Sequence, residues 1–315
     1  MNDEIKVSIC CVTYNQQEYI KQALDSFVNQ KTTFNYEIII HDDASNDNTV
    51  KIIKEYAKKY PNLIIPILQK ENQYSKKPNS ILEFCFGKAR GEYIALCDGD
   101  DGFLDKDKLM EQAKILDKNS EISLCTHDTK IVNDNGEYIE NISAYPDGIV
   151  NIKMFLNNSK SMHTSSMMFR KKDIINLPDY FHCATVGDLP LKLHLLSLGN
   201  CYHIDKVMSF YRTESKGSWS LQEKKDVDKL EKNHEMEMNI YNMFNQKTNY
   251  KYDELVKSRI LLKEFNYYLK TNNFDELYKK KYNSLYKKLS FKKRLKLKIK
   301  KIKFIYNIYL KMIGR

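Results

Sequence analysis

The first 130 residues alternate between short apolar runs and segments in which apolar residues recur every three or four positions. The runs predict strands at residues 7–13, 36–41, 63–68, 93–97 and 122–126. The spaced segments predict helices at residues 18–29, 50–60, 80–89 and 108–116. Such alternation favours an α/β fold with a mostly parallel sheet and helices on both faces. Pro66 lacks a backbone donor, so it indicates an edge or irregular position for the third strand.

Beyond about residue 215 the strand pattern ends. Residues 221–244 and 252–269 are polar segments with helical apolar spacing. We therefore expect an α/β domain over residues 1–220, a helical extension over residues 221–278 and a separate tail over residues 279–315.

The charge is concentrated in that tail. The 315 residues carry a net charge of +10, but residues 279–315 alone contain 15 Lys and Arg and no acid, which leaves −5 for the remainder. No apolar run is long enough to predict a transmembrane helix, and acids precede the first apolar stretch, unlike in a signal peptide. None of the seven cysteines forms a C-x-x-C pair, which predicts mostly buried, reduced thiols in a cytoplasmic protein.

Two acidic clusters follow predicted strands, at the end where parallel sheets bind ligands. Asp98-Gly-Asp-Asp-Gly102 follows one strand directly, and its crowded carboxylates repel one another unless a cation shares them. Hard divalent ions combine one or two carboxylates with substrate phosphates, so this D-x-D favours a metal-held diphosphate, with a solvated acidic turn as the alternative. Asp42-Asp43 follows another strand and either caps the next helix or accepts a hydrogen bond from a nucleobase.

Other assignments of the D-x-D fit less well. An EF-hand counted from Asp98 requires Gly and Glu where the chain has Phe103 and Leu109. An aspartyl-phosphate phosphatase carries its D-x-D after the first strand, whereas here it follows the fourth, so that enzyme class remains a minor alternative. Since the chain lacks G-x-G-x-x-G and P-loop motifs, a metal rather than a glycine-rich loop would have to hold phosphates.

The order of six segments resembles that of family 2 glycosyltransferases, in particular bacterial enzymes that build capsule and O-antigen polysaccharides. The segments are residues 7–15 (VSICCVTYN), 42–49 (DDASNDNT), 89–101 (ARGEYIALCDGDD), 164–170 (TSSMMFR), 187–188 (GD) and 209–212 (SFYR). The resemblance covers about residues 5–220. It implies a GT-A fold, a nucleotide-sugar donor, a divalent metal and inversion at the anomeric carbon.

The resemblance also implies roles for donor-side residues. Asp43 would contact the base, and Asp98 and Asp100 would serve the ribose and the metal, with Asp100 as the expected ligand of Mn²⁺ or Mg²⁺. The nucleotide pocket would be lined by Thr13, Tyr14 and Asn15.

On the acceptor side, Asp188 matches the catalytic base, and we expect partial burial to raise its pKa. The alternative is a helix cap ahead of Pro190. His163, Asp101 and Trp219 are further acceptor-side candidates. His163 would otherwise be a structural histidine, and Trp219 would otherwise only fix the chain after the catalytic domain.

Residues 287–312 mix lysines with large apolar residues. In a helix, one side would carry Phe291, Leu295, Ile302, Ile305 and Tyr309, with Lys298 intruding on it. A basic amphipathic helix suits an anionic membrane surface. A disordered tail and a nucleic-acid-binding arm are the alternatives, but the interspersed apolar residues favour the membrane, and no nucleic acid is expected as a partner.

Together these features predict a metal-dependent, inverting glycosyltransferase. It would move a sugar from a nucleotide sugar, with UDP the expected nucleotide, to a hydroxyl of a lipid-linked glycan in surface polysaccharide synthesis. It would act at the inner face of the cell membrane as a peripheral protein. The rival hypothesis is a catalytically silent protein that binds a glycan or nucleotide in the same cleft.

Overall fold

The computed structural model describes residues 4–77, 79–158, 162–216 and 227–312. The chain divides into two compact units, Met1–Asn249 and Tyr250–Arg315. The helix α9 (Val227–Lys247) therefore belongs to the first unit, so this division does not coincide with the boundaries expected after residues 220 and 278.

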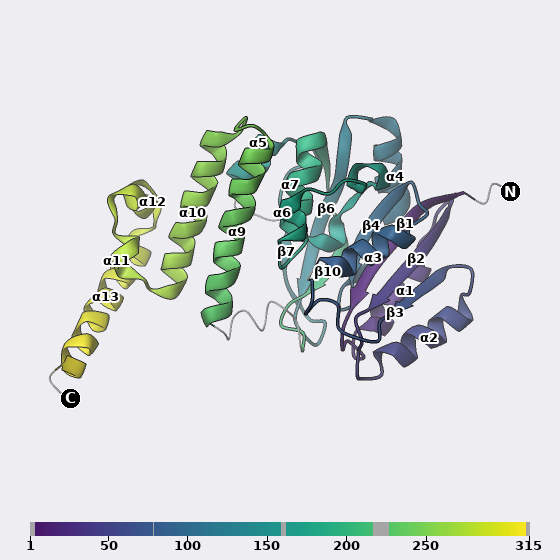
Figure 1. Cartoon of the computed structure of the whole chain (residues 1–315), viewed down its shortest axis with the longest axis horizontal. Helices are drawn as coiled ribbons and strands as arrows, with labels where there is room; N and C mark the ends of the chain where they lie inside the picture. The colour runs from purple at the N-terminus through teal and green to yellow at the C-terminus, as the bar shows by residue number, and fades with distance from the viewer. Residues whose placement is uncertain (1–3, 78, 159–161, 217–226, 313–315) are drawn as a thin grey trace. The chain divides into compact units, whose positions relative to one another are not determined.

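The described residues of the first unit form a ten-stranded sheet, shown in Figure 1. Its order is β3-β2-β1-β4-β9-β6-β10-β5, with β7 paired to β6 and β8 paired to β10. The strands are β1 (Ile5–Thr13), β2 (Asn35–Asp42), β3 (Ile64–Leu68), β4 (Tyr93–Asp98), β5 (Gly102–Phe103), β6 (Ile122–Val132), β7 (Tyr138–Ile142), β8 (Gly148–Val150), β9 (Met168–Arg170) and β10 (Asn200–Arg212).

Most of the long strands point the same way. β3, β2, β1 and β4 are parallel neighbours, and so are β6 and β10. The short β9 pairs antiparallel with both β4 and β6, so it joins the two parallel groups without reversing their direction. The carboxyl ends of β1, β2, β4, β6 and β10 consequently meet at one edge of the sheet.

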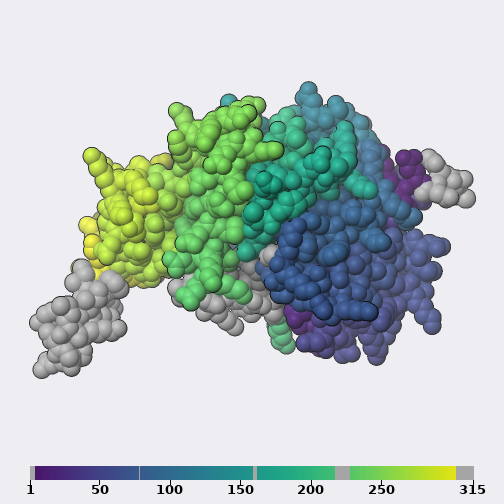
Figure 2. Space-filling model, in the orientation of Figure 1, coloured from purple at the N-terminus to yellow at the C-terminus, as the bar shows by residue number. Residues whose placement is uncertain are grey.

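Helices bury both faces of this sheet, as the strand pattern predicts. On one face, the odd-numbered residues of β1, such as Ile9, share a core with α1 (Ile20–Val28), α2 (Thr49–Lys59) and α4 (Lys108–Lys118). On the other face, the Cys10 thiol lies against Cys85 of α3 (Ser80–Lys88). Figure 2 shows the blue and teal atoms of α3 and α7 (Asp188–Leu198) covering much of the sheet.

The remaining helices of this unit lie toward its C-terminal part. They are α5 (Ile152–Asn157), the 3-10 turns Thr164–Ser166 and Lys171–Ile174, and α6 (Asp179–His182). α9 packs against α6 and α7, and Phe244 meets Tyr180 edge to face with ring centroids 6.1 Å apart. This packing explains why α9 is part of the sheet-containing unit.

The structure confirms the elements predicted in the first 126 residues, and β3 is the edge strand that Pro66 indicated. It also adds β5 and the strands β7 to β10, which the sequence analysis did not find. β10 was not predicted because its alternation is broken by register shifts and because its buried positions include His203 and Ser209. The sheet is therefore mixed, with a predicted parallel half and a second half in which only β6 was predicted.

The second unit is helical throughout its described residues. It contains α10 (Asp253–Thr271), α11 (Phe274–Leu277), the 3-10 turn Lys280–Tyr282, α12 (Asn283–Lys288) and α13 (Phe291–Met312). A small core joins Phe265, Phe274, Leu277, Tyr282 and Leu297. Across the residues described here, we find no helix with the length and apolar character needed to cross a bilayer.

Candidate active site

Hydrogen bonds join the loops that follow β1 and β2 beyond the carboxyl edge of the sheet. The Asn15 N–H donates to Ser45 Oγ (2.8 Å), and the Asn46 N–H donates to Asn15 Oδ1 (2.9 Å). Asn15 and Ala44 have positive φ angles of 52° and 65°. Asparagine tolerates this conformation but alanine does not favour it, so the cross-loop bonds hold a strained backbone in place. Next to Asn15, the Tyr14 side chain stays 46% exposed and available to a ligand.

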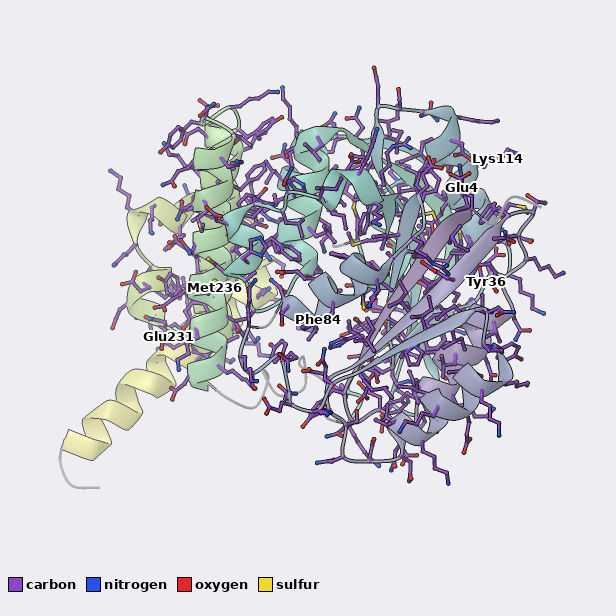
Figure 3. The ribbon with its side chains drawn as sticks, turned by 45° about the vertical axis from the view of Figure 1, so that its right-hand side comes forward. Glu4, Tyr36, Phe84, Lys114, Glu231 and Met236 are labelled. Carbon is purple, nitrogen blue, oxygen red and sulfur yellow. The ribbon has the colours of Figure 1, made fainter. Side chains whose placement is uncertain are left out.

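Asp43 fixes the loop that follows β3. Its Oδ1 accepts a hydrogen bond from the Gln73 N–H (2.7 Å) and its Oδ2 accepts one from the Tyr74 N–H (3.0 Å). Beside it, buried His41 stacks on Phe84 of α3, labelled in Figure 3, with ring centroids 5.4 Å apart. A carboxylate oxygen can accept more than one hydrogen bond, so these two bonds leave Asp43 able to contact a nucleobase as well. That contact stays a prediction.

The Asp98-Gly-Asp-Asp turn packs directly on the loop after β1. The Gly99 N–H donates to the Val12 carbonyl (2.9 Å). A Cβ at Gly99 would lie 2.4 Å from Gln16 Oε1 and 2.8 Å from Thr13 Cβ, so only glycine permits this approach. The Thr13 hydroxyl in turn donates to Gln16 Oε1 (2.7 Å). Thr13 therefore lies against the acidic turn.

Arg212, the last residue of β10, ties the acidic turn to neighbouring segments. Its Nε donates to the Asp100 carbonyl (3.1 Å), and its backbone N–H donates to Asp101 Oδ1 (2.9 Å). The buried guanidinium also donates to Gln22 Oε1 (2.6 Å) on α1 and to carbonyls just after β6. Three residues further on, the Ser215 hydroxyl donates to Asp100 Oδ2 (2.6 Å). The C-terminal end of β10 thus fixes the turn that carries the candidate metal ligand.

Asp188 begins α7 and is held by a lysine one turn along the same helix. Lys192 Nζ donates to Asp188 Oδ2 (2.6 Å) and to the Met162 carbonyl (3.1 Å). The side chain of Lys192 is 2% exposed, whereas that of Asp188 is 32% exposed. Gly187 occupies the position before the helix, so Asp188 is not its cap. The arrangement leaves an accessible carboxylate anchored by a buried ammonium.

His163 lies beside the acids as a neutral ring. Its Nδ1 is 3.9 Å from Asp101 Oδ2, and its ring packs on Tyr211 with centroids 4.1 Å apart. Burial, together with the charge of Lys192, lowers the pKa of His163 to about 3. The Ser165 N–H donates to Nδ1 (3.3 Å), so Nε2 carries the ring proton and is a hydrogen-bond donor.

The carboxyl groups influence one another. Burial, followed by the charges of Asp100 and Asp188, raises the pKa of Asp98 to about 7. Burial also raises the pKa values of Asp100 and Asp101. Asp188 differs: burial alone would raise its pKa, but the ammonium of Lys192 holds it below the ordinary value. Our expectation that burial would raise the pKa of Asp188 is therefore wrong.

The acidic turn suits a divalent cation. Its three carboxyl groups are crowded and desolvated, and Asp101 Oδ2 is buried without a hydrogen-bond partner among the described residues. A hard cation bound through oxygen ligands would favour the ionised form of these carboxyl groups. In the described ranges no three acid, histidine or cysteine groups converge to surround an ion. If Asp100 holds the ion, phosphate and water would therefore supply the remaining ligands, as is usual for Mg²⁺.

The structure places the predicted site residues at one edge of the sheet. This group comprises Thr13, Tyr14, Asn15, Asp43, Asp98, Asp100, Asp101, His163 and Asp188, whereas Trp219 lies outside the described residues. Sequence reasoning missed Gln16, Lys192, Arg212 and Ser215. Two signals were available: Arg212 closes one of the resembling segments, and Lys192 follows Asp188 at a spacing that faces it on a helix.

Comparisons of sequence point to one family. The profile of glycosyl transferase family 2 matches residues 8–177, more than half of the chain. An uncharacterized protein of Mycobacterium tuberculosis is 35% identical over 219 residues, which cover 68% of this chain and 60% of that protein. The chain thus spans less than two thirds of that relative's length. The poly(ribitol-phosphate) beta-N-acetylglucosaminyltransferase TarS of Staphylococcus aureus is 31% identical over 118 residues, 36% of this chain and 19% of TarS.

Solved structures share the fold. S. aureus TarS 1–349 in complex with UDP-GlcNAc has a TM-score of 0.65 at 18% identity, covering 93% of this chain and 79% of that chain. The mannosyltransferase PcManGT from Pyrobaculum calidifontis in complex with GDP-Man and Mn²⁺ has a TM-score of 0.57 at 12% identity, covering 99% and 84%. These matches confirm the GT-A fold expected from the resemblance. With that fold and a profile match over more than half of its length, the chain belongs to glycosyl transferase family 2.

Proposed function

We propose that the protein is a metal-dependent, inverting glycosyltransferase that moves a sugar from a nucleotide sugar to a hydroxyl of a glycan. One observation carries the proposal: an accessible, ionised carboxylate at Asp188 lies within electrostatic reach of the crowded acids that follow β4. The first group can accept a proton and the second can hold a diphosphate through a cation. The ligands of TarS and PcManGT support a nucleotide sugar as donor, with UDP as our first choice of nucleotide.

The residues divide between donor and acceptor. Thr13, Tyr14 and Asn15 would line the nucleotide, while Asp43 would contact its base and Asp98 its ribose. Asp188 would accept the proton of the acceptor hydroxyl as the hydroxyl oxygen attacks the anomeric carbon. The bond to the diphosphate breaks on the opposite side of that carbon, so a single displacement inverts its configuration. Mn²⁺ or Mg²⁺ at Asp100 would neutralise the charge of the leaving diphosphate.

The acceptor would lie on the His163 side of Asp188. His163 offers a hydrogen-bond donor through Nε2, which matches the oxygen of a sugar hydroxyl, and Asp101 lies beside it. We propose a surface polysaccharide as the product, and the name of TarS, which specifies transfer of N-acetylglucosamine to poly(ribitol phosphate), supports a long polymer as the acceptor. A lipid-linked form of that glycan would be the acceptor.

The helix α13 supports action at a membrane surface. Four exposed apolar side chains follow one another at spacings of four, four and three residues: Phe291 (74%), Leu295 (47%), Ile299 (48%) and Ile302 (67%). This spacing places them on one side of the helix, while Leu297 faces the core of its own unit. An apolar stripe among lysines matches the inner, anionic face of the cell membrane. The side chains of Ile305 and Tyr309 lie outside the described residues.

Nucleotide binding is the first test. Thermal unfolding would be followed with UDP, GDP, dTDP and CMP, each with and without Mn²⁺. We expect one nucleotide to raise the melting temperature only with metal, since a ligand at 100 times its Kd stabilises by ~2.7 kcal/mol. Asp100→Ala should abolish this shift, whereas Asp188→Ala should keep the shift and lose sugar transfer.

Other outcomes would select the alternatives. Metal-dependent nucleotide binding without turnover of any matching nucleotide sugar would favour the catalytically silent binding protein. Release of inorganic phosphate from phosphate esters without a nucleotide would favour the phosphatase. Sugar transfer that survives both Asp100→Ala and Asp188→Ala would contradict the proposal itself.

A further inference from the structure

We propose that Lys192 is a positioning residue that holds the Asp188 carboxylate in the orientation in which it takes the proton of the acceptor hydroxyl. This inference deepens the proposed function and rests on it for the role of Asp188. It adds a second residue to the proton-accepting group, one that touches neither donor nor acceptor.

Two hydrogen bonds fix the position of the Lys192 ammonium. Lys192 Nζ is fixed at two points on different segments, Asp188 Oδ2 (2.6 Å) on its own helix and the Met162 carbonyl (3.1 Å) outside it. The lysine side chain is 2% exposed, so the ammonium cannot swing into water without leaving both partners. The ammonium thus fixes the Asp188 carboxylate through Oδ2, while the Asp188 side chain keeps its 32% exposure.

Burial and neighbouring charged groups set the pKa of Asp188. Burial acts on the Asp188 carboxyl and favours its neutral form. Asp98, at the end of β4, has the higher pKa of the two and is uncharged where Asp188 titrates. Lys192 from α7 opposes the effect of burial, supported by the Leu189 N–H. His163, from the segment before the Thr164–Ser166 turn, is uncharged at cellular pH and adds little. The ionised state of Asp188 therefore depends chiefly on Lys192.

The hydrogen bond from Lys192 to the Met162 carbonyl also connects Asp188 to the acceptor side. Met162 directly precedes His163, whose Nε2 proton is available as a donor. By bonding to the Met162 carbonyl, Lys192 sets the distance between α7 and the segment that carries His163. Loss of Lys192 should therefore reduce kcat more than it changes the KM for the nucleotide sugar, which binds at the other loops.

The sign of the pH effect follows from these groups. In Lys192→Met, a side chain of similar length lacks the ammonium, so the pKa of Asp188 should rise. The base is then protonated at a higher pH, and the acidic limb of the kcat/KM profile should move upward by the same amount. Lys192→Arg restores a cation, and it should return the limb toward that of the unchanged protein. Activity would be read as metal-dependent release of the nucleoside diphosphate from a panel of nucleotide sugars.

A second readout does not require activity. In protein labelled with ¹³C at the aspartate carboxyl carbons, the resonance lost in Asp188→Asn identifies Asp188, and its titration can be followed directly by NMR. The matched control is Lys108→Met, because Lys108 is another fully buried lysine that bonds a side chain one helical turn away, Gln112 (2.8 Å). We expect the Asp188 titration to move in Lys192→Met and to stay unchanged in Lys108→Met.

The outcomes separate the two proposals. An unchanged Asp188 titration in folded Lys192→Met would overturn the role of Lys192, even if the enzyme transfers sugar. If the titration moves but the unchanged protein uses no nucleotide sugar, the proposed function fails and the electrostatic link stands. If Lys192→Met does not fold, Lys192→Gln keeps a hydrogen-bond donor without the charge, and the same titration decides.

Discussion

Buried carboxyl groups occur at both ends of the strands of the sheet, and they differ in their hydrogen-bond partners. Glu37, near the start of β2, is fully buried and accepts hydrogen bonds from Ser8 Oγ (2.7 Å), the Arg90 N–H (2.7 Å) and Arg90 Nε (2.8 Å). Asp101, at the opposite end, is also buried but keeps one oxygen without a partner among the described residues. A carboxyl group whose oxygens are both hydrogen-bonded stabilises the fold, whereas a buried carboxyl oxygen without a partner marks a candidate functional group.

Glu37→Ala should therefore destabilise the protein without affecting ligand binding. It leaves the Ser8 hydroxyl and the Arg90 N–H without their buried acceptor, and we expect the free energy of unfolding to fall by roughly 3 kcal/mol. Urea unfolding would measure the loss. Glu37→Gln keeps an acceptor oxygen and should cost less, and an equal loss in both variants would contradict this account.

Arg212→Lys should weaken metal-dependent nucleotide binding. A single ammonium cannot reach the Asp100 carbonyl, Gln22 and the carbonyls after β6 at once, as the guanidinium does. We expect the acidic turn to loosen and the nucleotide Kd with Mn²⁺ to rise about tenfold, equivalent to ~1.4 kcal/mol. Calorimetric titration would show it, and an unchanged Kd would remove Arg212 from the support of this turn.

Among single residues, sequence analysis singled out the candidates whose interaction partners lie close to them along the chain. The acids after β4 were found because they adjoin each other, and Asp188 was found through the family segments. The partners of Asp43 lie about 30 residues further on, in a loop whose path depends on β3. The effect of Lys192 was predictable in principle, but only by weighing an ion pair against burial, and that balance needs the folded geometry.

Among the elements, the turn after β4 depends most on a single glycine. Gly99→Ala would place a methyl group 2.4 Å from Gln16 Oε1, so the turn or the loop after β1 must shift. We expect at least a tenfold loss in metal-dependent nucleotide affinity. The control is Gly87→Ala in α3, where a Cβ meets nothing within 4 Å. That change should stabilise the protein by about 0.5–1 kcal/mol through helix propensity, as thermal unfolding would show.

The strand pattern was informative where strands are buried on both faces and separated by helices. β1, β2 and β4 are continuous apolar runs for this reason. β9 has three residues and β5 has two, too short for any periodicity to appear. β10 carries polar side chains that bond inside the sheet, such as Ser209 with Thr129 of β6 (3.2 Å), and these bonds become visible only once the strands are paired.

At the scale of the whole molecule, the positive charge is concentrated in residues 279–315. This distribution predicts how the protein binds a bilayer. The full chain should bind vesicles that contain phosphatidylglycerol more tightly than neutral phosphatidylcholine vesicles, and high salt should weaken binding. Replacing Ile299 and Ile302 with Ser should weaken binding about tenfold, because two exposed apolar side chains are lost. Vesicle sedimentation would measure it.

Two controls make this test specific. Ile139 and Ile175 are also exposed, at 49% and 73%, but lie in the first unit, so replacing both with Ser should leave binding unchanged. A fragment of residues 1–249 should bind the nucleotide without sedimenting with vesicles. Equal binding by fragment and full chain would place the membrane contact outside α13.

The distribution of thiols has a practical consequence. Six cysteines are buried, whereas Cys183 is exposed, five residues before Asp188. Burial raises the pKa values of five of the six, namely Cys10, Cys11, Cys97, Cys125 and Cys201, which further suppresses their reaction with maleimides. The unaltered protein thus offers one addressable position for a fluorophore or spin label, from which the arrival of donor and acceptor can be followed in real time without removing any native cysteine.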